Sequence, residues 1–213
     1  MTDRRRFAGL VLGVALVVAG CTGATTTSPV ASAPASAGSD QAAAEQYCTD
    51  QGGMLVDRVA TWNTNADQSQ WLQLAGRQRF CEFEMGAGDE TTRISVDLVT
   101  LYSEEPTLAG VAYLSKVKPT LPPQPSANPA TYNCQEGLGG SASFGNGAAG
   151  GGWVDTSQPV FVVMDMCAFE DMSAIDAFGI LYYADGTVRG ADLATKMRYK
   201  PGPGNRLPAI FGN

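Results

Sequence analysis

The chain of 213 residues contains no histidine. That absence excludes the Ser-His-Asp and Cys-His catalytic arrangements and every metal site that needs an imidazole ligand. Basic residues are scarce as well, since 14 lysines and arginines stand against 21 acidic residues and the net charge is −7. An acidic chain without a basic cluster binds nucleic acid poorly, so we expect no nucleic-acid partner.

Several ligand-binding motifs are also missing. There is no CxxC pair and no Asp-x-Asp-x-Asp-Gly calcium loop, so the sequence predicts no metal and no other cofactor. The glycine-rich segment 139–152 lacks the Lys-Ser/Thr ending of a phosphate-binding loop and precedes an expected strand, not a helix. We interpret it as a flexible surface loop.

The N-terminus has the parts of a bacterial lipoprotein signal. Arg4–Arg6 form a basic region, and the uncharged run from Phe7 to Val18 is too short for a membrane span, which needs about 20 apolar residues. Val18-Ala-Gly-Cys21 resembles the lipobox of bacterial lipoproteins. The resemblance implies that residues 1–20 are removed as a signal peptide and that acyl chains such as palmitate on Cys21 anchor the protein to the extracytoplasmic face of the cell membrane. An ordinary secretory signal, the alternative, would also export the chain.

Residues 21–39 are rich in Thr, Ser, Ala, Pro and Gly, which predicts a flexible tether. Removal of residues 1–20 deletes three arginines and one aspartate, and the net charge becomes −9. Such a domain is repelled by anionic headgroups, so we expect it to contact the membrane through its lipid alone.

The four remaining cysteines form two pairs with equal spacing. Cys48 and Cys81 are 33 positions apart, and so are Cys134 and Cys167. Cys48-Thr-Asp-Gln-Gly-Gly resembles Cys134-Gln-Glu-Gly-Leu-Gly-Gly with one inserted residue, and each later cysteine begins a Cys-x-Phe-Glu motif. We infer an internal duplication. A duplicated module should close its own bridge, so of the three possible connectivities we choose Cys48 with Cys81 and Cys134 with Cys167.

The apolar patterns predict an α+β fold in which a unit of helix, three antiparallel strands and helix occurs twice. We expect the units to share one sheet of six strands, because a three-stranded unit alone leaves exposed edges. The predicted strands are Met54–Trp62, Arg79–Met85, Arg93–Tyr102, Pro159–Phe169 and Ala177–Tyr183, and the predicted helices begin near Asp40, Thr107, Asn128 and Leu193. The predicted boundaries are 40–118 for the first unit, 119–127 for a proline-rich linker, 128–200 for the second unit and 201–213 for a tail.

The cysteine and paired-glycine motif, preceded in the second unit by Asn128-Pro-Ala-Thr-Tyr-Asn-Cys134, resembles a family of small bacterial lipoproteins labelled haemolysin-like, a domain of unknown function. This chain would hold two tandem copies. The first copy lacks the Asn-Pro opening, and the likeness covers only part of each unit. The chain as a whole is similar to exported actinobacterial proteins. The resemblance implies an anchored, disulfide-bonded architecture and assigns no catalytic residue.

Carboxylates are the only side chains left for acid–base chemistry. The candidates beside the repeated strands are Glu82, Glu84, Asp97, Glu170, Asp171 and Asp176. The simplest interpretation is that the acids of the Cys-x-Phe-Glu motifs face solvent while Phe83 and Phe169 face the core. We therefore expect no enzyme. A carboxylate-based hydrolase of envelope polymers is the alternative.

Four aromatic residues beside polar or glycine-rich loops form a candidate contact surface. They are Trp62, Trp71, Trp153 and the phenylalanine of the Phe144-Gly145 step in the glycine-rich loop. Large aromatic side chains often anchor interfaces. We expect a binding or interaction domain whose partner is an envelope protein, a glycan or a small ligand.

Overall fold

The computed structural model describes residues 37–123, 127–142, 144, 148–155, 157, 163–202 and 211. The expected signal peptide, Cys21 and most of the expected tether lie outside these residues, as do Gly145, most of the expected tail and part of the linker. Within the described ranges, no helix is both long enough and apolar enough to cross a membrane.

The helices and strands form two groups along the chain, and the fold is mixed α+β as predicted. The first group is α1 (Ala37–Asp50), β1 (Met54–Trp62), β2 (Leu72–Met85), β3 (Thr92–Asp97), α2 (Leu98–Tyr102) and α3 (Leu108–Ser115). The second is α4 (Pro129–Tyr132), the π-helix η3 (Asn133–Gly137), β4 (Gly151–Asp155), β5 (Val163–Met164), β6 (Met166–Ala168), β7 (Ala174–Asp176), α5 (Ala177–Ala184) and α6 (Leu193–Lys196). Two short 3-10 turns, η1 (Gln68–Gln70) and η2 (Gly88–Glu90), lie in the hairpin loops of the first group.

One sheet of seven strands, in the order β5-β4-β1-β2-β3-β7-β6, includes strands from both groups. All its pairs are antiparallel. β5 and β6 stand at opposite ends of this order, yet only Asp165 separates them in the chain. The segment therefore pairs with β4 on one side of Asp165 and with β7 on the other. The sheet curves into a nearly closed barrel. It has seven strands where six were expected: the described part of the strand expected over Pro159–Phe169 is divided at Asp165, and β4 and β7 lie outside the predicted strand ranges.

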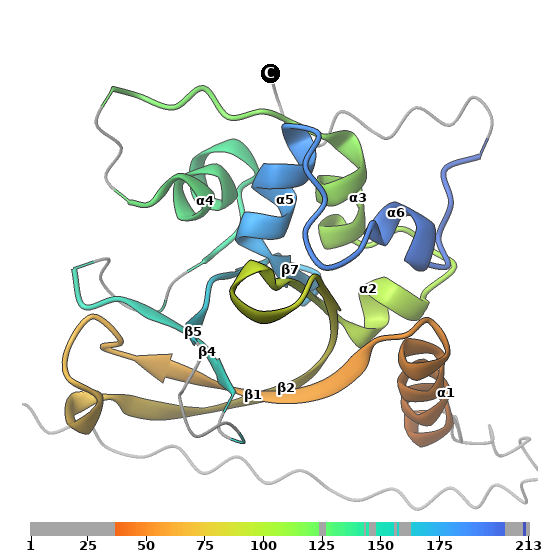
Figure 1. Cartoon of the computed structure of the whole chain (residues 1–213), viewed down its shortest axis with the longest axis horizontal. Helices are drawn as coiled ribbons and strands as arrows, with labels where there is room; N and C mark the ends of the chain where they lie inside the picture. Colours follow the sequence, from red (N-terminus) through yellow and green to blue (C-terminus); the bar gives the residue numbers. More distant parts are fainter. Residues whose placement is uncertain are drawn as a thin grey trace, which may run out of the picture. The chain divides into compact units, whose positions relative to one another are not determined.

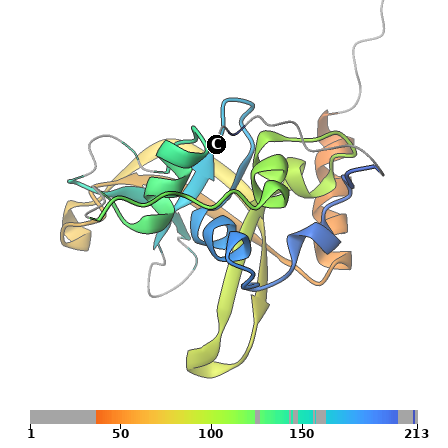
Figure 2. The ribbon, with the colours of Figure 1, turned by 90° about the horizontal axis from the view of Figure 1, so that it is seen from above.

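The two faces of the sheet bury different groups of side chains. Outside the barrel, Val96, Ile175 and their neighbours pack against the helices, and α2 to α6 lie on the same side of β1 and β2 (Figure 1). Inside, Phe80, Met166 and Ala174 form a smaller cluster. Phe80 is adjacent to Cys81, a member of the outer core, and successive strand residues point to opposite faces. The hairpin of β2 and β3 projects away from the helices in Figure 2.

Two predicted strands were wrong in part or in full. The strand expected over Arg93–Tyr102 ends at Asp97, where α2 begins, and the strand expected over Ala177–Tyr183 is the helix α5. Asp97 and Asp176 are the N-caps: their side chains accept hydrogen bonds from the backbone N–H groups of the first helical turn. Both runs are apolar on nearly every side, so their periodicity does not distinguish a buried helix from a strand.

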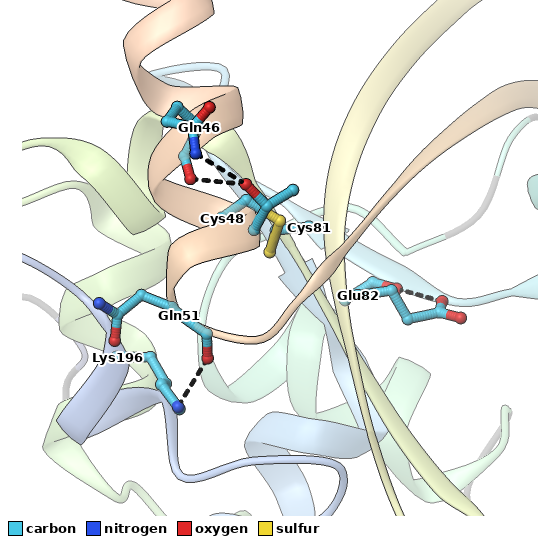
Figure 3. The surroundings of a disulfide bond; sticks show 8 residues. Gln46, Cys48, Gln51, Cys81, Glu82 and Lys196 are labelled. Carbon is cyan, nitrogen blue, oxygen red and sulfur yellow. Dashed lines mark hydrogen bonds between the residues drawn. A yellow bond between two sulfur atoms is a disulfide. The ribbon is translucent and has the colours of Figure 1, made fainter.

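In each group one disulfide joins a helix to a strand. Cys48 of α1 is bonded to Cys81 of β2, and Cys134 of η3 is bonded to Cys167 of β6, which is the predicted pairing. All four cysteines are buried. Figure 3 shows the first bridge, beside which Lys196 Nζ of α6 donates a hydrogen bond to the carbonyl of Gln51 at 2.8 Å.

Each bridge lies against the second glycine of a Gly-Gly pair. A Cβ atom at Gly53 would lie 2.3 Å from Cys81 Sγ, and a Cβ atom at Gly140 would lie 2.6 Å from Cys167 Sγ. Real Cβ atoms do not approach heavy atoms so closely. The glycines therefore leave the space that the sulfur atoms occupy.

The second motif, which is one residue longer than the first, contains a π-helix. In the first group Gly53 N–H donates to Cys48 O, and in the second Gly140 N–H donates to Cys134 O across one more residue. The π-helix η3 spans Asn133–Gly137 inside that longer turn. A π-turn accommodates one extra residue in a helix without moving its ends, so both glycines reach the same position beside their bridge.

We expect Gly53→Ala and Gly140→Ala each to lower the free energy of unfolding by about 1–3 kcal/mol, because an added methyl group overpacks a buried site. Urea denaturation measures this. Gly52→Ala is the control, since Gly52 has a positive φ of 83° but no heavy atom within 4 Å of its Cβ position. In a Cys48→Ala/Cys81→Ala background, most of the Gly53→Ala penalty should disappear and the Gly52→Ala penalty should not. An undiminished Gly53→Ala penalty contradicts the packing argument.

Candidate functional site

The aromatic residues of the predicted contact surface do not all lie on one face of the sheet. Phe144 and Trp153 lie together, with ring centroids 5.7 Å apart, while Gly145, the second residue of the predicted Phe-Gly step, lies outside the described ranges. Trp71 lies elsewhere, in a pocket of about 120 Å³ that Thr61 also lines. Thr61 follows Ala60, whose cross-strand partner is Trp153. Because successive strand residues point to opposite faces, Trp71 and Trp153 lie on opposite faces of the sheet.

The loops beside the predicted aromatic residues do meet. Trp62 is half-buried at the end of β1. In the loop that follows it, Asn63 N–H donates to Gly150 O at 3.2 Å and Asn65 N–H donates to Ala149 O at 3.1 Å. The end of the glycine-rich loop is thus bonded to the loop between β1 and β2.

The acids of the Cys-x-Phe-Glu motifs lie mostly as predicted. Glu84 and Glu170 are exposed, whereas Phe83 and Phe169 are only 3 % and 7 % exposed. The side chain of Glu84 forms an ion pair with Arg93 at the surface. Neither glutamate is among the described residues that line the cleft beside Asp176, so their placement does not favour a catalytic role there.

Glu82 departs from the prediction, because it is buried inside the barrel. Its Oε2 atom accepts a hydrogen bond from Arg58 at 2.5 Å and another from Ser95 Oγ at 2.7 Å. A buried carboxylate loses its hydration, which is why an inward-facing glutamate was not expected. The charge of Arg58 and the hydroxyl group of Ser95 compensate this loss. Their strands β1, β2 and β3 are joined by this polar cluster.

Asp97 and Asp171 are structural caps. Asp97 is 1 % exposed and accepts hydrogen bonds from Thr100 N–H, from the Thr100 hydroxyl and from Ala174 N–H. Burial raises the pKa of Asp97, and these hydrogen bonds oppose the rise. Asp171 accepts a hydrogen bond from Leu108 N–H at the start of α3. Both carboxylates hold the two groups of elements together.

Asp176 has a similar position in the second group but a different environment. It is 2 % exposed, and its side chain accepts a hydrogen bond from Phe178 N–H at 2.9 Å. Burial raises the pKa of Asp176 to about 6, although backbone hydrogen bonds and the nearby Arg189 counteract part of the rise. This residue lines a cleft formed by residues of both groups.

The cleft has a volume of about 1040 Å³. It lies between α4, the kink that separates β5 from β6, the hairpin of β2 and β3, and the loop after α5. Its main polar side chains are those of Arg93, Asn128, Thr131, Asp165, Asp176 and Arg189. The two loops that these backbone hydrogen bonds join form part of the same wall through Asn65 and Gly150.

Asp165 is held by the start of α4. As predicted, Asn128 is the N-cap of this helix, and its Oδ1 atom accepts a hydrogen bond from Thr131 N–H at 2.8 Å. Its Nδ2 atom donates to Asp165 Oδ2 at 2.8 Å, and the Thr131 hydroxyl donates to the same oxygen at 3.4 Å. Asp165 Oδ1 accepts no hydrogen bond from any residue of the described ranges. That oxygen is available to a ligand.

Arg189 also lines the cleft, from the loop after α5. Its Cζ atom lies 5.1 Å from the ring centroid of Tyr182 and 6.0 Å from that of Phe178. Its Nε atom is buried and has no hydrogen-bond partner within the part of the chain that the structure describes. A buried N–H without a partner costs free energy. The guanidinium as a whole belongs to a half-buried residue that lines the cleft and forms no ion pair with a described residue, so it can bind an acceptor there.

The sequence indicated two residues of this site, Asp176 and Asn128, and did not indicate Asp165 or Arg189. Asp176 was a candidate acid, and Asn128 was a predicted N-cap. Asp165 and Arg189 lie in segments without a motif, so no sequence pattern marked them. The only available signal was that an acidic residue, Asp165, and a basic residue, Arg189, lie near the second set of strands, and charged residues near strands are common in proteins.

Comparisons of the chain with protein-family models, curated protein sequences and solved structures gave no match. Among the described residues, no three His, Cys, Asp or Glu side chains gather closely enough to hold a metal ion. The chemistry of the cleft is therefore inferred from its own geometry.

The raised pKa of Asp176 predicts a pH-dependent stability. With a pKa of about 6 in the folded chain and an ordinary value of 3.8 in the unfolded chain, the carboxyl ionises first in the unfolded state as the pH rises. Asp176 therefore destabilises the fold progressively between about pH 4 and pH 6, by up to about 3 kcal/mol, and its contribution is constant above that range.

Asp176→Asn removes this charge and keeps a good N-cap. We expect the variant to gain stability relative to the natural chain as the pH rises from 4 to 7, as measured by urea denaturation at each pH. Asp185→Asn, an exposed acid at the end of α5, is the matched control and should follow the natural chain. Parallel curves for Asp176→Asn and the natural chain are the contrary result.

Proposed function

We propose that the protein is a lipid-anchored binding protein of the bacterial envelope that holds a polar ligand in the cleft beside Asp165 and Asp176. Its two disulfides are typical of a domain that works in an oxidising, extracytoplasmic compartment. The basic and apolar N-terminal regions and Cys21 supply the export and anchoring signals.

The observation that carries the binding role is the unused polar capacity of the cleft walls. Asp165 accepts hydrogen bonds from described side chains at Oδ2 alone, and Arg189 forms no ion pair with a described residue, although both side chains line the cleft. Polar groups in a concave site, backed by apolar side chains such as Met164 and Phe178, are typical of sites that bind small molecules.

We also propose that the fold arose by internal duplication. Each group runs from a helix with a cysteine through a Gly-Gly pair and antiparallel strands to an Asp-capped helix. The corresponding residues Val96 and Ile175 are cross-strand partners, as expected for two related units that meet across a twofold axis. On this proposal Gly53→Ala and Gly140→Ala have similar effects on stability, and strongly unequal effects would oppose it.

A hydrolase is the second candidate, and one observation favours it. Asp165 and Asp176 line the same cleft, and burial raises the pKa of Asp176. Two carboxyl groups in different environments are the arrangement that glycosidases use for acid and base. Asp176→Asn separates the two functions, because it should retain a bound ligand but abolish any turnover of envelope polymer.

The anchor is tested by Cys21→Ser in a bacterium that processes lipoproteins. We expect the natural chain in the membrane fraction, labelled by radioactive palmitate. The variant should lose the label, because serine has no thiol to acylate. Cys48→Ser is the control for a cysteine of the folded domain and should still be labelled. A natural chain that is unlabelled and soluble would exclude the lipid anchor.

The cleft is tested by filling it. Ala127 lines the cleft and is half-buried, so Ala127→Trp should occupy part of its volume. Val99 is 66 % exposed in a separate groove beside α1 and α2, which makes Val99→Trp the matched control. The full chain in detergent is titrated with a panel of sugars and amino acids, and amide NMR shifts are followed.

We expect at least one compound to shift the amide resonances of Thr131, Asp165 and Asp176 in the natural chain and in the Val99→Trp variant. In the Ala127→Trp variant the affinity for this compound should fall about tenfold or more, because the tryptophan excludes most of the contacts of a small ligand. Compounds that bind all three forms equally would place recognition outside the cleft.

A further inference from the structure

The backbone holds Arg189 firmly although the residue lies in a loop. The next residue, Gly190, is pressed against the strands: a Cβ atom there would lie 2.3 Å from Phe83 O and 2.6 Å from Ile94 N. Gly190 N–H also donates to the Thr92 hydroxyl at 3.1 Å, and its φ of 62° is one that glycine adopts without strain. The loop is therefore fixed to β2 and β3, and Arg189 stands beside the cleft.

Arg189 differs from Arg93, the other arginine that lines the cleft. Arg93 forms an ion pair with Glu84. Arg189 forms no ion pair with any described residue, and its Nε atom is buried without a hydrogen-bond partner. Asp176 attracts it only over a longer distance. A guanidinium that is partly buried and lacks an acceptor fits a site whose acceptor belongs to a ligand.

The rest of the wall defines what else the ligand carries. Asp165 Oδ1 is open to a hydroxyl donor, and the ring of Phe178 offers an apolar surface. Asp165 and Asp176 also disfavour a group with two negative charges, such as a phosphate, because like charges in a poorly hydrated cleft repel each other. A carboxylate with one negative charge suits a single guanidinium fork.

We propose that Arg189 binds the carboxylate of an acidic sugar, with a sugar hydroxyl donating to Asp165 and the sugar ring lying near Phe178. This inference rests on the proposed function, because it names the ligand class of the same cleft. The cleft volume of about 1040 Å³ is sufficient for a sugar of one to three rings. The net negative charge of the protein does not by itself indicate an acidic ligand. The ligand class is inferred from Arg189, which lines the cleft and forms no ion pair with a described residue.

The probes are methyl β-D-glucuronide and methyl β-D-glucoside, which differ only in the carboxylate. Each is titrated into the full chain in detergent with both disulfides intact, and the Arg189 Nε–H resonance and the amide of Asp165 are followed by NMR. The variants are Arg189→Gln, Arg189→Lys and, as the matched control, Arg77→Gln. Arg77 is an exposed arginine on β2, outside the cleft.

We expect the glucuronide to bind about tenfold more tightly than the glucoside, because one charge-assisted bidentate contact is worth at least that factor. Arg189→Gln should reduce the glucuronide to the affinity of the glucoside. Arg189→Lys keeps the charge and the aliphatic stem, so it should fold normally and give an intermediate affinity. Arg77→Gln should leave the ratio unchanged.

Three results would overturn the inference. Equal affinity of the two glycosides in the natural chain, with shifts in the cleft that Ala127→Trp abolishes, would leave the binding function standing and remove the role of Arg189. Inorganic phosphate that competes as strongly as the glucuronide would show a general anion site instead of an acidic-sugar site. No shift of Arg189 Nε–H with either glycoside would exclude the acidic sugar, and the cleft-filling experiment would then decide the binding function separately.

Discussion

The pairing of the segment Val163–Ala168 with both edges of the sheet is the constraint on which the rest of the structure depends. β5 pairs with β4 and β6 pairs with β7, so the strands of the two groups form one nearly closed barrel instead of two open sheets. Closure removes exposed strand edges, which would otherwise template association with other chains. The bridge between Cys134 and Cys167 attaches a helix to this segment and reduces the entropy that it can gain by leaving the barrel.

The same constraint builds the candidate site. Because the chain changes partner at Asp165, this residue is turned out of the regular ladder toward α4, where Asn128 binds it. Asp176 lies at the end of β7, the neighbour of β6, and so reaches the same cleft. Asp97, the N-cap of α2, has both carboxylate oxygens engaged by donors from both groups, whereas Asp176 lines the cleft, and burial raises its pKa to about 6. These two N-capping aspartates at the ends of neighbouring strands thus differ, because Asp176 is also part of the cleft wall.

Much of the local structure was predictable from particular residues. The strand Met54–Trp62 has the predicted bounds, since β-branched and aromatic residues follow a Gly-Gly pair and precede a polar loop. The helices after Asp97 and Asp176 were mistaken for strands, because their apolar residues surround the whole helix and only the capping aspartate marks the change. Of the site, Asp176 and Asn128 carried a signal. Asp165 lay within the strand expected over Pro159–Phe169, and no local pattern marked the kink there, whereas Arg189 lies in a loop, which has no periodicity.

The sequence by itself determined the cysteine pairing, the α+β class and the order of most elements, because equal spacings and local apolar patterns encode these directly. The joining of both halves into one sheet was expected from the need to cover strand edges, but the kinked closure at Asp165 was decided by tertiary structure. So was the inward turn of Glu82, whose partner Arg58 comes from another strand. Such features depend on which distant strand edges meet, and that is a cooperative property of the whole sheet that no local pattern contains.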